Sequence, residues 1–398
     1  MESIKKIYKI GYGPSSSHTM GPTKAAEIFK SKNPTANSFR ITLYGSLAAT
    51  GKGHLTDIAI KSTLGPKKCE FIWKPNEVLP AHTNGMKFEA IDAMGIVKSN
   101  WIVYSIGGGE IMSDELLPDK KYIYTMYKLS DIMEWSNKTG KSFWEYVLET
   151  EESDIFDYLN EVWKTMCRTI INGLEAEGVI PGGLGLQRKA NSYYIKGGGY
   201  KESLKSRALL FAYALATAEE NACGGIVVTA PTCGSAGVLP AVLYYIYEKH
   251  NFSDKSILRA LATAGLFGNI IKKNASISGA VVGCQGEIGS ACAMASAAAN
   301  QLFGGSIAQI EYAAEMGLEH HLGLTCDPVC GLVQIPCIER CSFAAARAFN
   351  CNMYSMLSDG IHRVHFDKVV EVMKQTGKDL PSLYKETSQG GLAAKVIV

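Results

Sequence analysis

The first third of the chain carries the hydrophobic pattern of a small α/β unit. Residues 38–48 ("SFRITLYGSLA") and 100–111 ("NWIVYSIGGGEI") have the β-branched and aromatic content of strands, and each leads into a glycine-containing turn. Residues 50–64 lie between them and can form a helix that begins near Thr56 and Asp57. The pattern therefore predicts strands combined with at least one helix in this part.

Farther along, apolar residues recur with the spacing of helices and alanine becomes abundant. Four segments read as helices, at 154–178, 203–222, 253–273 and 307–321. We expect an α+β fold with an N-terminal α/β domain over 1–148 and a mainly helical catalytic domain over 149–398.

Composition and charge exclude several classes of protein. Hydrophobic residues make up 46% and charged residues 20% of 398, which is typical of a globular chain. A formal net charge of +2 predicts no binding to nucleic acid or to an acidic membrane surface. Two uncharged stretches, 221–247 and 288–310, are interrupted by proline and glycine or dominated by alanine and serine, so we expect buried helices. Without an export signal, a reducing cytoplasmic location is expected.

Cysteine is the strongest chemical signal. Four of the eleven cysteines lie between residues 321 and 341, namely Cys326, Cys330, Cys337 and Cys341. A reducing compartment argues against disulfides, while zinc, an iron–sulfur cluster and plain core packing all remain open. Pro328 prevents a regular helical pair of Cys326 and Cys330, whereas a helix beginning at Cys337 would place Cys341 one turn later.

Residues 11–22 ("GYGPSSSHTMGP") offer a second candidate site. The hydroxyls and backbone N–H groups of Ser15, Ser16, Ser17 and Thr19 precede a helix, where a carboxylate or phosphate can bind. An elaborate N-cap explains the same residues equally well. His18 in the middle of the loop favours a functional role.

A third candidate is His54, which lies in a glycine-rich loop three residues before Asp57. A histidine oriented by a carboxylate suits a general base, although an ordinary surface or core histidine is more frequent. The run "IGGGE" (106–110) does not match the dinucleotide-binding fingerprint.

Taken together, the motifs resemble those of the single-chain bacterial iron–sulfur L-serine dehydratases. The matching segments occur in order over nearly the whole chain and include "GPSSSHTMGP", "YGSLAATGKGHLTDIAI", "NGM", "NASISGAVVGCQGE", "EHHLGLTCDPV", "GLVQIPCIER" and "TGKDLPSLYKETSQGGLA". The resemblance implies β-elimination of water from L-serine, giving pyruvate and ammonia, with a [4Fe–4S] cluster and without pyridoxal phosphate.

Carried over position by position, the resemblance implies that Cys284, Cys326 and Cys337 are the cluster ligands. Three thiolates for four irons leave one iron open as a Lewis acid. Cys330 and Cys341 stand where many relatives have other residues, and we interpret them as bystanders. Relatives often cap the open iron with a cysteine near the C-terminus, a device not expected here because this chain ends in "GGLAAKVIV".

The same resemblance suggests roles for the remaining polar residues. His54 is the first candidate for the base and His18 the second, with Lys272 a further catalytic candidate. We expect the substrate to be bound by a set of hydroxyl and amide side chains, namely Ser15, Ser16, Ser17, Thr19, Asn84, Asn274 and Ser276. A site formed by both domains would lie between them.

Three alternatives remain at this point. A related iron–sulfur lyase could act on L-threonine or L-cysteine, because one methyl group in the substrate changes binding by only about 1–3 kcal/mol. A non-catalytic iron–sulfur sensor or a structural zinc protein is the alternative from another class, although no helix-turn-helix with a basic face is evident. The expected partners are a small amino-acid substrate and a second copy of the chain in a homodimer.

Overall fold

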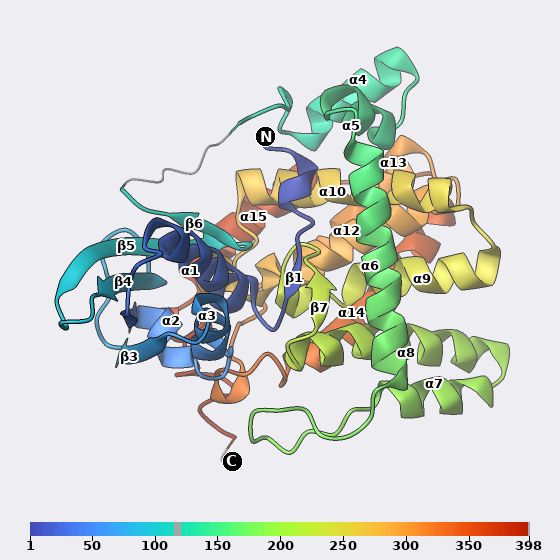
Figure 1. The fold of residues 1–398 in the computed structure, drawn as a ribbon. Coiled ribbons are helices and arrows are strands. Elements are labelled where there is room, and N and C mark those ends of the chain that lie inside the picture. Colours follow the sequence, from blue (N-terminus) through green and yellow to red (C-terminus); the bar gives the residue numbers. More distant parts are fainter. Residues whose placement is uncertain (115–120, 397–398) are drawn as a thin grey trace.

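The computed structural model describes residues 1–114 and 121–396. It confirms the predicted α+β class, because a five-stranded sheet unit lies beside a larger body made almost entirely of helices (Figure 1). Each part has a hydrophobic core of its own.

The smaller unit is a mixed sheet covered by helices. Its elements are β2 (Ser38–Tyr44), β3 (Lys68–Lys74), β4 (Gly85–Ile91), β5 (Val97–Gly107), β6 (Glu110–Met112), α1 (Gly21–Lys32), α2 (Gly45–Thr50) and α3 (Thr56–Leu64). The strand order is β3-β2-β4-β5-β6, with β2 parallel to β3 and the other neighbours antiparallel. Helix α1 packs on the sheet through Phe29, whose ring lies against Phe39 and Phe88. The two predicted strands and the helix beginning at Thr56 are confirmed.

The larger body is built from long helices. They are α6 (Ile155–Glu175), α8 (Glu202–Ala222), α9 (Val238–His250), α10 (Asp254–Asn274), α12 (Ile288–Leu302), α13 (Ile307–Glu319), α14 (Cys337–Met356) and α15 (Phe366–Asp379). All four helices expected from periodicity are present. In α12 every residue except Gln301 is buried, because its alanines and serines let neighbours approach closely. A Cβ on Gly317 of α13 would lie only 3.0 Å from the Ala293 backbone.

Short elements accompany the long helices of the larger body. They are β1 (Ile10–Tyr12), β7 (Ile226–Val228), α4 (Leu129–Thr139), α5 (Phe143–Thr150), α7 (Ala190–Gly198) and α11 (Gly279–Val282). β1 pairs antiparallel with β7. The N-terminal residues Ile4 and Tyr8 belong to the larger core, as does Phe143 of α5, whose ring meets Phe267 at 5.4 Å.

The predicted boundary between residues 148 and 149 stays a prediction, but the buried cores divide the chain elsewhere. The smaller core draws only on residues between 25 and 111, while residues 1–8 and 124–147 contribute to the larger one. The two uncharged stretches include the mostly buried helices α9 and α12, as expected, but the first also contains the strand β7, whose Ile226 is exposed. No helix among the residues described is long and apolar enough to cross a membrane.

Candidate active site

The serine-rich loop is a buried turn that directly precedes α1. Residues 16–20 form one π-helical turn, and the Ser15 hydroxyl accepts a hydrogen bond from the His18 N–H at 3.1 Å. The Ser15 N–H in turn donates to the Thr19 hydroxyl at 3.2 Å. Ser15 is therefore an N-cap, as one interpretation of the sequence held, and all residues from Ser15 to Thr19 are buried.

His54 stands beside this loop with a defined tautomer. Its Nδ1 donates a hydrogen bond to the Thr50 carbonyl at 3.0 Å, so the lone pair resides on Nε2. The Thr19 hydroxyl donates to the His54 carbonyl at 2.8 Å and locks the two loops together. The carbonyl of Thr50 thus orients the ring, in place of the Asp57 carboxylate that the sequence suggested.

His18 lies against His54, with ring centroids 4.4 Å apart. The Ser46 hydroxyl donates to the Glu386 carbonyl at 3.1 Å, so at 3.3 Å it can only accept from His18 Nε2–H. The Ser17 hydroxyl then faces the His18 Nδ1 lone pair at 2.9 Å. Both nitrogens of His18 are thereby engaged.

Burial makes both imidazoles neutral near pH 7. Desolvation lowers the pKa of His54 to about 4, and it lowers the pKa of His18 well below the usual value, with the neighbouring His54 adding to the shift. Two neutral rings in contact, one with a lone pair on Nε2, can accept a proton from a bound molecule.

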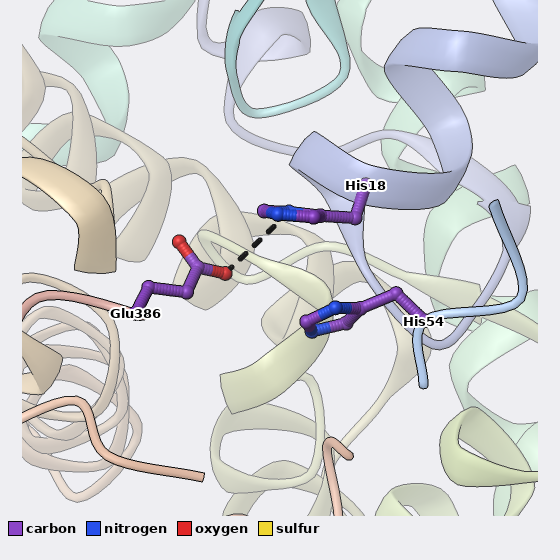
Figure 2. Close-up of side chains that lie close together, drawn as sticks. All are labelled: His18, His54 and Glu386. Carbon is purple, nitrogen blue, oxygen red and sulfur yellow. Dashed lines mark ion pairs between the residues drawn. The ribbon is translucent and has the colours of Figure 1, made fainter. Parts of the chain in front are cut away.

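Glu386 completes this group, and the sequence reasoning did not single it out. Its Oε1 lies 3.7 Å from His18 Nδ1, and Figure 2 shows its carboxylate beside both rings. Nitrogen and oxygen atoms of His18, His54 and Glu386 lie within 4.8 Å of one another. Burial raises the pKa of Glu386 well above its usual range, with Glu287 and Cys284 contributing. The only available signal was the unusual polar run "KETSQGG" near the end of the chain.

The thiols predicted as ligands gather next to this group. Cys284 and Cys326 are buried, and their sulfurs lie 3.9 Å and 3.8 Å from Glu287 Oε2. Cys337 opens α14, and burial, followed by the nearby Cys284, raises the pKa of its thiol. Contact with the Cys326 thiol lowers the pKa of Cys284.

Arg340 is the cation of the thiol cluster. It lies one turn after Cys337 and donates to the Thr325 carbonyl at 2.7 Å. Burial opposes its charge, but the nearby sulfurs of Cys284 and Cys337 raise its pKa. A permanent positive charge here stabilises thiolates, and sequence reasoning overlooked it.

The C-terminal segment connects the histidines to the thiols. The Cys326 N–H donates to the Tyr384 carbonyl at 2.8 Å, and the Glu386 N–H donates to the Cys326 carbonyl at 2.8 Å. This bridge brings Glu386 between the imidazoles and the sulfurs. Gly279 closes the other side, since a Cβ there would lie 3.0 Å from Cys326 Sγ.

The donor set fits a metal centre. All eleven cysteines are free, Cys284 and Cys326 gather with Glu287 within 4.8 Å, and Cys337 lies near enough to Cys284 for that thiol to add to the effect of burial in raising its pKa. Soft thiolates select zinc or iron–sulfur clusters, and a carboxyl and a guanidinium stand beside them to tune the charge. The geometry agrees with a metal cofactor without choosing its type.

The two thiols interpreted as bystanders have different surroundings. Cys341 is buried on one face of α14, with its sulfur 3.3 Å from the Gly234 carbonyl. Cys330 is exposed at a left-handed position with φ of 54°.

Other predicted site residues are distributed unevenly. Lys272 forms an ion pair with Glu2 at 3.1 Å, and Asn274 donates to the Tyr127 carbonyl at 2.6 Å. Among the described residues, no hydrogen bond or ion pair joins either of them to the histidines or thiols, because the last turn of α10 faces the N-terminal segments.

Ser276 and Asn84 lie closer to the site. The Ser276 carbonyl is 3.0 Å from a Cβ placed on Gly286, so its loop packs on the turn that holds Cys284. Asn84 is fully buried, and within the described chain neither atom of its amide has a hydrogen-bond partner. The backbone carbonyl of Asn84 accepts a hydrogen bond from the Ser105 N–H at 3.0 Å, and the Ser105 hydroxyl donates to the Ser17 backbone carbonyl at 2.6 Å. An unpartnered buried amide beside the serine loop is a place where water or a ligand can bind.

Comparison with known proteins gives matches over nearly the whole chain. Residues 3–71 match the family model of the serine dehydratase beta chain, and residues 81–393 match that of the serine dehydratase alpha chain. Curated relatives include L-serine dehydratase of Streptomyces coelicolor (40% identical, 99% of both chains covered) and L-serine dehydratase of Haemophilus influenzae (39%, 100% of both). L-serine dehydratase 1 of Escherichia coli is 38% identical over 100% of this chain and 99% of its own.

Proposed function

The chain belongs to the serine dehydratase family, and we propose that it eliminates water from L-serine to give pyruvate and ammonia. The observation that carries the proposal is the neutral His54, whose Nε2 keeps a lone pair beside His18 and Glu386, together with the influence of Cys284 on the Glu386 carboxyl, which places a thiol near this group. β-Elimination requires these two capacities together, a base for the α-proton and an acid for the leaving hydroxyl.

We assign the cofactor as a [4Fe–4S] cluster bound by Cys284, Cys326 and Cys337. When bound, such a cluster would supply a Lewis-acidic iron that lacks a protein thiolate and can assist departure of the hydroxyl. Arg340 offsets the negative charge of the thiolates, and Glu287 lies within 3.9 Å of two of the sulfurs. Cys284 and Cys326 are buried, which limits the access of water to their sulfurs.

His54 acts as the base in this proposal. Its Nδ1–H stays on the Thr50 carbonyl, which leaves Nε2 to take the α-proton of serine. His18 cannot offer an equivalent lone pair without giving up its contact with Ser17 or Ser46, so it supports the His54 ring. Loss of the α-proton and the β-hydroxyl gives aminoacrylate, which tautomerises to the imine and is hydrolysed to pyruvate and ammonium.

The substrate's polar groups have partners in the smaller unit. We assign the serine carboxylate to the loop of Ser15, Ser16, Ser17 and Thr19 together with the Asn84 amide, whose unpartnered Nδ2 can donate a hydrogen bond to it. Ser276 lines the opposite side on the loop beside Cys284. Lys272 and Asn274 take no part in this arrangement, since both have partners elsewhere.

Purification without oxygen tests the proposal. The protein should be brown, contain about four irons and four acid-labile sulfides per chain, and form pyruvate from L-serine. All three amino acids can undergo β-elimination, so the rates on L-serine, L-threonine and L-cysteine are compared to identify the preferred substrate. Colourless protein with stoichiometric zinc would identify a structural zinc protein and contradict the proposal.

A homodimer in a reducing compartment is the remaining part of the proposal. Six large apolar side chains are exposed along α14 and the segment after it, namely Phe343, Met353, Tyr354, Leu357, Ile361 and Val364. A second copy would cover them, as apolar patches of this kind are typical of interfaces. Light scattering should give twice the mass of the chain, and Leu357→Glu should shift it to the monomer.

A further inference from the structure

A second group of possible metal ligands lies outside the proposed active site. Glu311 on α13, His362 in the segment before α15, and His365 at the N-cap of α15 bring their ligand atoms within 4.8 Å of one another. Glu311 Oε2 is 3.0 Å from His362 Nε2, and Glu311 Oε1 is 3.7 Å from His365 Nδ1. None of these residues has a role in the proposed elimination.

The hydrogen bonds of His362 turn its lone pair toward the carboxylate. Its Nδ1 faces the Gly360 carbonyl at 3.1 Å, which can only accept, so the neutral ring carries its proton there. Nε2 then presents a lone pair to Glu311 Oε2, and within the described chain neither atom completes a hydrogen bond. Two acceptors 3.0 Å apart are held together by a proton or by a metal ion between them.

Glu311 is poorly compensated in its buried position. Its side chain is 2% exposed, and the hydrogen bond that it accepts from the described residues comes from the Phe366 N–H, at 2.6 Å to Oε1. Burial raises its pKa, and Asp367 adds to that shift while the two histidines oppose it. A buried carboxylate beside acceptor atoms is costly unless a cation binds there.

The surroundings also give the site rigidity and access. The ring of Tyr312 stacks on His362 at 4.1 Å with an interplanar angle of 5°. The His365 side chain is 68% exposed, so solvent reaches one side of the group. Histidine ligands of metals commonly donate their second N–H to a backbone carbonyl, as His362 does to Gly360.

We propose that Glu311, His362 and His365 bind one divalent transition-metal ion, with Zn²⁺ as the best fit. Two imidazoles and one carboxylate, with water in the fourth position, are a common zinc coordination set. Tetrahedral zinc with bonds of about 2.0–2.1 Å places its ligand atoms roughly 3.3 Å apart. The observed separations lie on either side of that value, at 3.0 Å from His362 Nε2 to Glu311 Oε2 and 3.7 Å from His365 Nδ1 to the other carboxylate oxygen, Oε1.

The ion would fasten the start of α15 to α13. Farther along α15, the Thr376 hydroxyl donates to the Gln285 side-chain carbonyl at 3.0 Å, and the Gln285 amide donates to the Met373 carbonyl at 3.3 Å. Gln285 directly follows Cys284. The metal would therefore stabilise the helix that supports the Cys284 turn, which makes its role structural.

Zinc binding to the anaerobic, cluster-loaded protein tests this inference. Chains stripped on a chelating resin are dialysed against buffered Zn²⁺, and zinc and iron are counted by elemental analysis. Wild type should bind one zinc per chain and melt at a higher temperature. His362→Gln and His365→Gln should weaken zinc binding at least about tenfold and remove the thermal shift.

Two controls keep the test decisive. His365 is exposed, so its replacement does not endanger folding, and its variant alone can refute the proposal. His320→Gln is matched, because His320 also lies beside a carboxylate, Glu319, at 3.7 Å but is half-exposed. All variants keep the same thiols, so zinc bound there cancels in the comparison. Equal zinc affinity in wild type and His365→Gln, or no zinc uptake by wild type, would overturn the proposal.

Discussion

Replacement of His54 by glutamine should remove the base and leave the site otherwise assembled. Glutamine is uncharged, as the buried imidazole is near pH 7, and its amide can still donate to the Thr50 carbonyl that now accepts from Nδ1. The His18 ring, the serine loop and the three thiols need not move. The change therefore isolates the lone pair on Nε2.

The expected loss follows from the role of the residue. General-base catalysis contributes about 10²–10⁴-fold, so kcat on L-serine should fall by that factor, or about 3–5 kcal/mol in the barrier. His18→Gln removes hydrogen bonds to Ser17 and Ser46 and leaves the base in place, so a loss of roughly tenfold is expected.

The assay is steady-state pyruvate formation by anaerobic protein whose iron content is measured for each variant. L-serine deuterated at the α-carbon adds a second readout, because a slowed proton transfer should show a larger isotope effect on kcat in His54→Gln. If His54→Gln kept more than a third of wild-type kcat at equal iron content, the base would be another group.

Three further predictions concern the same region. Lowering the pH from 7 to 5 should cost wild type about 2 kcal/mol of unfolding free energy more than it costs His54→Gln. The pKa of His54 is about 4 in the folded protein and near 6.5 in the unfolded chain, so only the unfolded state gains the proton in that interval. Urea titrations at both pH values measure the difference, and an equal pH dependence of the two proteins would contradict the prediction. Gly279→Ala places a Cβ 2.8 Å from Glu287 Oε2, so it should lower the free energy of unfolding by about 1–3 kcal/mol and also lower the iron content. Gly198→Ala, whose Cβ has no atom within 4 Å, should change neither quantity. Thermal melts and iron analysis measure both effects. Cys337→Ser should lose iron and sulfide while the exposed Cys330→Ser retains both, and the reverse pattern would reassign the ligands.

The helices that follow from the local hydrophobic pattern were predicted correctly from the sequence. The helices of the larger body follow from periodicity, and the helix at Cys337 follows from "CIERC" after Pro336. The pairing of His18 with His54 was not predicted as a contact, although each was singled out on its own. Their proximity depends on Thr19 and Thr56, which tie two loops together through backbone carbonyls.

The site residues that could not be predicted reach the site through contacts between segments that are far apart in the sequence. Glu386 reaches the site only because its segment pairs with Cys326, and its left-handed backbone, with φ of 59°, gives no pattern in the sequence. Lys272 and Asn274 were selected for their nearness in sequence to Ser276. A helix end can face either way, and the Lys272 side chain forms its ion pair with Glu2 near the N-terminus.

The most direct test of the central claim is a product balance on L-serine. Anaerobic, cluster-loaded protein should convert L-serine to pyruvate and ammonium in equal amounts, and folded Cys337→Ser protein should form neither above background. Equal turnover by wild type and Cys337→Ser, or no pyruvate from wild type containing four irons per chain, would contradict the account.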